Sequence, residues 1–149
     1  MEAGPHTILP SSTEKLLGGI ISQDPKLKQH ILEGEESLIK QLTSRINGLC
    51  MLSSTTSLKT RLMVANGIVV SKICYLIQLW GGCEDYLLRP FQVLQTRAAR
   101  SVIGCCWFTP KRKLLKMCNW LSIKQLVFYQ SVILAHKIAT TRSTFFLAA

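Results

Sequence analysis

Carboxylates are scarce in this sequence, and none of them occurs after Asp85. Up to Tyr86, eight Lys/Arg are balanced by eight Asp/Glu, whereas the part from Leu87 onward holds ten Lys/Arg and no Asp or Glu. The net charge of +10 therefore belongs to the C-terminal half. An excess of this kind suggests a polyanionic partner, either nucleic acid or an anionic membrane surface, although a solvated basic surface is the alternative.

The shortage of carboxylates bears directly on catalysis. Asp24 and Asp85 are the two aspartates, and no carboxylate cluster suited to two-metal catalysis is apparent. The sequence also lacks G-x-S-x-G, P-loop and H-E-x-x-H motifs. We therefore predict a protein that is not an enzyme and that uses no cofactor and no metal ion.

Long apolar runs and a signal peptide are also missing. The most apolar window, Leu62 to Trp80, contains Lys72 near its centre, which costs roughly 2.5–3.5 kcal/mol in a membrane span. Met1 to Pro10 has neither a charged n-region nor an apolar h-region. We expect no membrane partner and an intracellular location, in the nucleus or the cytoplasm; residues 110–113, PKRK, are a weak match to a nuclear-localisation patch.

The six cysteines show no C-x-x-C pair, and the adjacent Cys105 and Cys106 are poorly placed to bind one metal together. Without a signal peptide, an oxidising compartment is not indicated. We expect buried free thiols at these positions, which are Cys50, Cys74, Cys83, Cys105, Cys106 and Cys118.

Apolar residues recur every three or four positions over most of the chain, which predicts an all-α bundle of about six helices. The expected helices are about 24–33, 35–51, 58–80, 87–102, 110–118 and 122–138. Residues 15–22 form one possible orphan strand, because no second strand is evident. We expect a flexible tail at 1–14, a helical domain at 15–138 and a C-terminal tail at 139–149.

Several residues are expected to begin, end or bend these helices. Ser57 and Ser122 are candidate N-caps. Gly81 and Gly82 are expected to end the third helix in the left-handed conformation. Pro90 either lies in the first turn of the fourth helix or kinks it.

The basic half contains the candidate binding residues. Arg89, Gln92, Thr96 and Arg100 are expected to form a stripe near the solvent edge of the fourth helix, with Arg97 beside it. Lys111, Arg112 and Lys113 are expected in the first turn of the fifth helix. Cations there oppose the helix macrodipole and concentrate positive potential, which makes a plausible phosphate site. Side chains that simply extend into water are the alternative. The candidate nucleic-acid-binding residues are Arg89, Arg97, Arg100, Lys111, Arg112, Lys113 and Lys116.

Aromatic residues flank the PKRK run. Trp107, Phe108 and Trp120 can stack on bases, but anchoring a core is the commoner use of such side chains. From the sequence both interpretations stay open.

An ordered series of segments extends over most of the chain, from about Lys15 to Lys137. It includes LLGGIISQD, SLIKQLTSRINGL, LKTRLMVANGIVVSKICYLIQLWGG, FQVLQTRAARSVIG and TPKRKLLKMCNWLSIKQLVFYQSVILAHK. This series resembles the region just downstream of the catalytic palm in reverse transcriptases of non-LTR (LINE-like) retrotransposons. The resemblance implies a helical thumb and connection region that holds RNA or an RNA–DNA hybrid by its backbone.

The chain departs from that family in four respects. It has no (F/Y)-x-D-D motif with catalytic aspartates and no C-terminal cysteine–histidine motif, Leu27 stands where the family often has Trp, and Pro90 interrupts a usually unbroken helix. We therefore expect a fragment without the palm and without polymerase activity. The alternative is a helical protein-interaction module or inert remnant, which self-associates through exposed apolar surface such as the face of Leu16 to Ile21.

Overall fold

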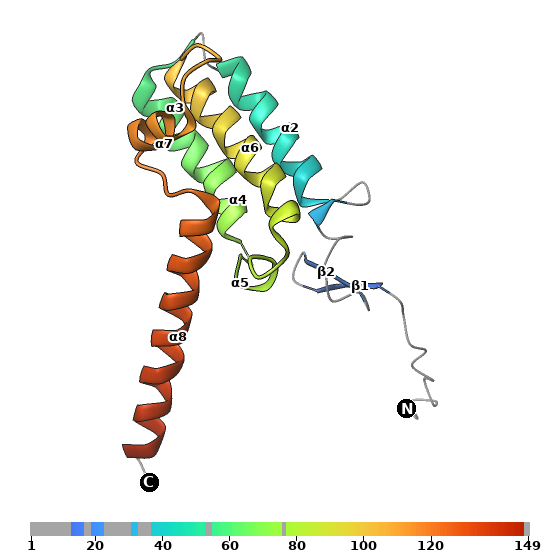
Figure 1. Cartoon of the computed structure of the whole chain (residues 1–149), viewed down its shortest axis with the longest axis vertical. Helices are drawn as coiled ribbons and strands as arrows, with labels where there is room; N and C mark the ends of the chain where they lie inside the picture. Colours follow the sequence, from blue (N-terminus) through green and yellow to red (C-terminus); the bar gives the residue numbers. More distant parts are fainter. Residues whose placement is uncertain are drawn as a thin grey trace, which may run out of the picture.

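A computed structural model of the chain describes residues 13–16, 19–22, 31–32, 37–52, 55–75 and 77–147, with helical side chains described as far as Thr141. The described part is a helical bundle with one short β-hairpin, which confirms the predicted all-α class (Figure 1). Helix α6 (Asp85–Ile103) is the central element of the bundle. It packs against α2 (Leu38–Met51), α3 (Leu58–Ala65), α7 (Lys111–Cys118) and the start of α8 (Ile123–Leu147).

The hairpin changes the interpretation of the N-terminal segment. Strand β1 (Thr13–Leu16) pairs antiparallel with β2 (Gly19–Ser22), so that Leu16 lies opposite Gly19. The prediction of an orphan strand is therefore wrong, because the segment folds back on itself and takes its partner partly from the expected tail. The helix expected at 24–33 lies outside the described residues, except at its last turn, where Ile31 is buried.

The core is formed where the apolar faces of α2 and α6 meet. Every residue predicted for these faces is buried: Leu38, Leu42, Ile46, Leu49, Leu87, Phe91, Leu94, Ala98 and Val102. Burying a large aliphatic or aromatic side chain contributes about 1.5–3 kcal/mol, so these faces hold the bundle together. Pro90 lies in the second turn of α6, not in the first turn.

The segment 58–80 is not one unbroken helix. Helix α3 continues into a π-helical turn, η2 (Asn66–Val70), and a short α4 (Ser71–Cys74). The backbone then becomes extended at Tyr75, with ψ of 121°, before α5 (Ile77–Trp80). The Trp80 indole N–H donates to the Tyr75 carbonyl at 3.1 Å, which satisfies an acceptor freed by the break.

This interruption leaves the predicted core contacts in place. Ile73, Ile77 and Trp80 are all fully buried on either side of the break. The Trp80 ring stacks on Phe91 of α6 with ring centroids 4.4 Å apart. The last turns of the predicted helix are therefore core, as expected, but two short helices supply them.

The expected left-handed stop at Gly81–Gly82 is also wrong. Among the described residues, positive φ occurs at Gly104 (72°), which follows α6, and at Asn119 (54°), which follows α7. Gly81 meets a different requirement. A Cβ there would lie 2.4 Å from the Ile77 carbonyl oxygen and 2.9 Å from the Val127 methyl groups, so only glycine allows α8 to approach the end of α5.

Helix α8 begins as predicted but continues past Ile138. The Ser122 hydroxyl accepts a hydrogen bond from the Gln125 backbone N–H at 3.5 Å. The Gln125 side-chain oxygen accepts one from the Ser122 backbone N–H at 3.0 Å, which completes a capping box. The helix runs to Leu147, so residues 139–147 are helical where a tail was expected. Beyond its first turns α8 projects away from the bundle (Figure 1). None of the helices in the described ranges is both long enough and apolar enough to cross a membrane.

Candidate nucleic-acid interface

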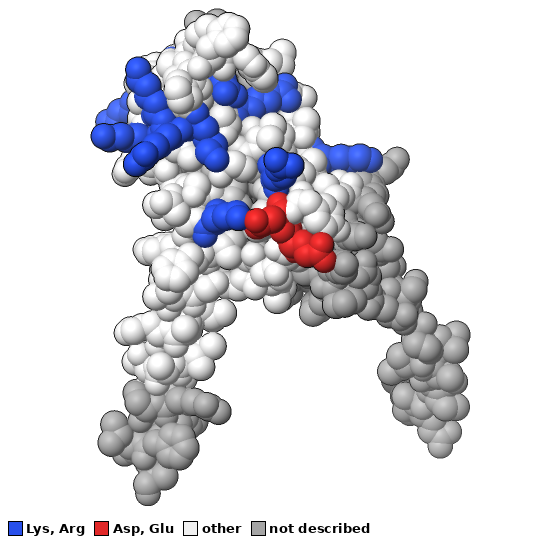
Figure 2. Space-filling view, viewed as in Figure 1, with Lys and Arg blue, Asp and Glu red and all other residues white. Residues whose placement is uncertain are grey.

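Four of the seven predicted binding residues belong to α7. Lys111, Arg112 and Lys113 occupy its first turn and Lys116 its last, and all four side chains are exposed. Lys and Arg side chains gather on the molecular surface over this helix, as Figure 2 shows in blue. The acidic side chains that the structure describes, Glu84 and Asp85, lie at the start of α6. The surface of α7 is therefore strongly electropositive.

The start of α7 lacks the groups that normally neutralise a helix N-terminus. Pro110 occupies the N-cap position, where it provides no side-chain hydrogen bond, and the first turn contains no acidic residue. The amide dipoles and three cations thus add their positive potentials at one place. Anions are favoured at such a helix end, because exposed N–H groups and positive charge act together.

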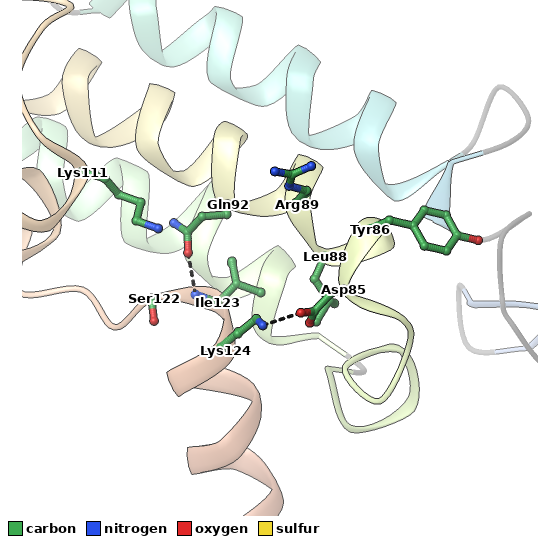
Figure 3. Close-up of a pocket in the computed structure, with 9 residues that line it drawn as sticks. All are labelled: Asp85, Tyr86, Leu88, Arg89, Gln92, Lys111, Ser122, Ile123 and Lys124. Carbon is green, nitrogen blue, oxygen red and sulfur yellow. Dashed lines mark hydrogen bonds and ion pairs between the residues drawn. The ribbon is translucent and has the colours of Figure 1, made fainter.

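A cavity of about 590 Å³ is lined by residues from the N-terminal half of α6, by the first residue of α7 and by the start of α8. Arg89 from α6 and Lys111 from α7 line it, and the Lys111 side chain points toward Gln92 (Figure 3). Lys124 of α8 lines the same cavity and donates to the Asp85 carboxylate at 2.6 Å. Both partners of that ion pair are largely exposed, so the pair contributes little to stability.

Two glutamines of α6 fix the connection between α7 and α8. The Gln95 side-chain NH2 donates to the Leu121 backbone carbonyl at 2.8 Å. The Gln92 side-chain oxygen accepts from the Ile123 backbone N–H at 3.1 Å. Gln92 also donates to the Gln95 side-chain oxygen at 2.9 Å. Gln95 is only 1% exposed, so these bonds are shielded from water. The network attaches the start of α8, which carries Lys124, to α6, which carries Arg89.

Arg97 and Arg100 form a separate group further along α6. Arg97 donates to the Asn47 side-chain oxygen of α2 at 2.9 Å. The Arg100 guanidinium lies 4.7 Å from the centre of the Trp107 ring, which is a cation–π contact. Both arginines line a second cavity of about 310 Å³, together with Trp107. The predicted residues therefore divide into two groups, around the start of α7 and around Trp107.

The predicted stripe on the fourth helix is only partly correct. Thr96 is 7% exposed and donates through its hydroxyl to the Gln92 carbonyl, while Gln92 is half-buried in the network described above. Gln92 therefore contacts the start of α8, and Thr96 is buried, so neither lies on the solvent edge of α6. Arg89, Val93 and Arg97 are the exposed residues of this part of α6.

The structure distinguishes the aromatic residues that the sequence left open. Trp107 and Phe108 are 71% and 88% exposed, so neither anchors the core. Trp120 is half-buried, and its indole N–H donates to the Asn66 side chain at 2.8 Å. Lys124 also lines the larger cavity, although it was not among the predicted residues. Its position two residues after the Ser122 cap could have indicated from the sequence that it lies in the first turn of a helix.

None of the six cysteines forms a disulfide; Cys118 is buried, four others are partly buried, and Cys106 is exposed, so the expectation of buried thiols is wrong at Cys106 and only partly met at the other four. Burial raises the pKa of Cys118 to about 11, with a smaller contribution from Cys105. Burial also raises the pKa of Cys74 and of Cys83, and Glu84 adds to the effect at Cys83. No group of three or more His, Cys, Asp or Glu side chains suited to a metal ion occurs within the described residues.

In comparisons with known proteins, no family model, curated protein or solved structure matches this chain.

Proposed function

We propose that this chain binds the sugar–phosphate backbone of RNA or of an RNA–DNA hybrid, in the manner of a reverse-transcriptase thumb. The observation that carries the proposal is the uncapped start of α7, where Lys111, Arg112 and Lys113 are exposed and no acidic side chain lies in the turn. Such a site suits phosphate groups, which carry charge but no base identity.

The cavity beside α7 supports the same function. Arg89 of α6 lines this cavity together with Lys111 and adds a cation beside α7, whereas Lys124 is paired with Asp85. Because α7 packs on α6 and the Gln92–Gln95 network attaches α8, the backbone positions that carry these cations are held relative to one another. Fixed cations on helices can follow a duplex backbone without reading its sequence.

The origin of the chain is part of this proposal. The resemblance described above supports descent from the thumb and connection region of a non-LTR retrotransposon reverse transcriptase, without its palm. The genomic sequence directly upstream of the Met1 codon tests this origin. Palm motifs there, in frame or interrupted by a stop codon, are the expected result, and unrelated sequence over that length would contradict it.

Filter binding to a blunt RNA–DNA hybrid at two salt concentrations tests the binding function. Binding through phosphates releases counterions, so the affinity should fall steeply as salt rises. The double variant Lys111→Gln/Lys113→Gln should bind more weakly and should reduce the slope of log K against log salt by about two. The matched control is Lys59→Gln/Lys137→Gln, which neutralises two exposed cations on α3 and α8.

The control variant should bind as the unmodified protein does. No binding to the hybrid at low salt would refute the proposal. Equal losses in the two double variants would also contradict it, because they would show that net charge alone, and not the α7 site, determines affinity.

A second candidate function is self-association through α8. From Phe128 onward every side chain described on this helix is exposed or half-buried, and the large apolar ones include Phe128, Tyr129, Val132, Leu134 and Ile138. No charged residue lies between Lys124 and Lys137. Two copies of this segment can therefore face each other without like-charge repulsion, which favours a second copy of the chain as the partner.

Size-exclusion chromatography with light scattering tests the second candidate. A dimer that persists at high salt and is lost in Phe128→Ser/Val132→Ser is the expected result. A monomer at all protein concentrations would contradict it.

A further inference from the structure

The loop between α6 and α7 exposes two large aromatic side chains at its tip. Thr109 donates its amide to the Cys106 carbonyl at 3.1 Å, which closes a four-residue turn. Trp107 and Phe108 occupy its two central positions and are 71% and 88% exposed. Turn centres normally carry Gly, Pro, Asn, Asp or Ser, and aromatics there gain nothing from burial. Positions that break a local sequence rule are expected at functional sites, which makes this exposed pair a candidate for ligand contact.

The turn holds Trp107 in a defined orientation. Gly104 ends α6 in the left-handed conformation and donates its amide to the Arg100 carbonyl at 2.8 Å. The chain then returns so that the Trp107 ring lies 4.7 Å from the Arg100 guanidinium. One ring face is therefore occupied by Arg100. Because the residue remains 71% exposed, the opposite face is open to solvent.

The surroundings of the turn favour an anionic aromatic ligand. Arg97 and Arg100 line the cavity beside Trp107, and the cations of α7 begin only three residues after Phe108. Glu84 and Asp85, the acidic side chains that are described, belong to the other end of α6. A nucleotide combines a flat base, which can stack on an indole, with a phosphate, which such cations can bind.

We propose that Trp107 and Phe108 stack on an unpaired base of the bound nucleic acid, while the cations of α7 hold the adjoining phosphates. This inference rests on the proposed function and makes it more specific: the preferred ligand is a duplex that ends in a single-stranded overhang. Stacking tolerates every base, so the site selects an unpaired strand and not a sequence.

Tryptophan fluorescence is a direct test, because the three indoles differ in exposure. Trp80 is fully buried and Trp120 is half-buried, so quenching by a stacked base reports mainly on Trp107. An RNA–DNA hybrid with a short unpaired overhang should quench the emission. The same hybrid with blunt ends should bind with little quenching, and Trp107→Phe should abolish the signal while retaining an aromatic ring.

Affinity measurements separate stacking from phosphate binding. Trp107→Ala and Phe108→Ala should each weaken binding of the overhang hybrid about fivefold to 150-fold, and should leave binding of the blunt hybrid unchanged. Leu79→Ala is the control, since Leu79 is a similarly exposed apolar side chain on α5, away from the α7 cations. Unchanged circular dichroism and melting temperatures establish that the variants are folded.

The possible results have distinct consequences. Equal affinity for blunt and overhang hybrids would overturn this inference and leave the proposed backbone binding intact. Binding of neither hybrid would overturn both. A concentration-dependent blue shift of the Trp107 emission without nucleic acid would show that the aromatic pair is buried in a protein contact, which would also overturn the inference.

Discussion

The side-chain oxygen of Gln92 accepts the Ile123 backbone N–H at 3.1 Å, so that α6 holds the first residue of α8. This bond replaces an intrahelical partner that the first amide of any α-helix lacks. The orientation of α8 is therefore set in part by one polar side chain on the central helix. Gln95 extends the same attachment to the Leu121 carbonyl.

The first prediction concerns the buried amide of Gln95. Gln95→Met keeps a similar volume but removes the partner of the Leu121 carbonyl and of the Gln92 amide. Leaving buried polar groups without partners costs about 1–3 kcal/mol, which we expect as the loss in the free energy of unfolding in urea. Gln78→Met, on the exposed side of α5, is the control and should change stability little. Equal stability of the Gln95 variant would show that the network is not stabilising.

The second prediction concerns Gly81. Gly81→Ala places a methyl group against the Ile77 carbonyl and the Val127 side chain, and should destabilise the protein by about 1–3 kcal/mol. Gly82→Ala is the matched control, because a Cβ there meets nothing within 4 Å. Thermal unfolding of the two variants measures the difference. If both melt alike, the close approach of α5 and α8 is not tight in solution.

The third prediction concerns the Cys118 thiol. Its pKa is raised to about 11 in the folded protein, so the folded state keeps a proton that the unfolded state loses above about pH 9. The free energy of unfolding should therefore fall as the pH rises from about 9 to about 11. Cys118→Ala should reduce this slope in urea titrations at several pH values. An unchanged slope in the variant would assign the pH dependence to other groups.

The fourth prediction concerns catalysis. The purified chain should not extend a primer on any RNA or DNA template, whichever divalent metal ion is added, because two-metal chemistry requires clustered carboxylates. Glu84 and Asp85 are adjacent in sequence, with Asp85 opening α6, and both are exposed. Metal-dependent incorporation of nucleotides that is abolished by Glu84→Ala, Asp85→Ala or Asp24→Ala would prove this prediction wrong. Incorporation that survives all three changes would indicate a contaminating polymerase.

The sequence predicted the core helices well because their apolar spacing is regular. The faces of α2 and α6 and the caps at Ser57 and Ser122 follow from local patterns. The break at Tyr75 was missed for a physical reason. Ile73, Ile77 and Trp80 keep helical spacing across it, and a pattern of buried positions does not register a change of ψ at one exposed residue between them.

The candidate site was less predictable. The exposed cations of α7 were identified from the sequence, but their separation from Arg97 and Arg100 depends on how α7 packs on α6. Helical spacing placed Gln92 and Thr96 near solvent, whereas Gln92 bonds to the first residue of α8 and Thr96 is buried. Contacts between segments far apart in sequence decided these cases, and local periodicity carries no information about them.

The length of α8 has a mechanical consequence. Its 25 residues span about 37 Å at 1.5 Å per residue, while its buried anchors, Ile123 and Leu126, lie within its first two turns. The helix is therefore attached to the bundle at its N-terminal end, where Gln92 bonds to Ile123, and projects freely beyond that end. Each degree of rotation about the start of α8 would move its distal end by about 0.6 Å, so a rotation of about 5° would displace that end by about 3 Å.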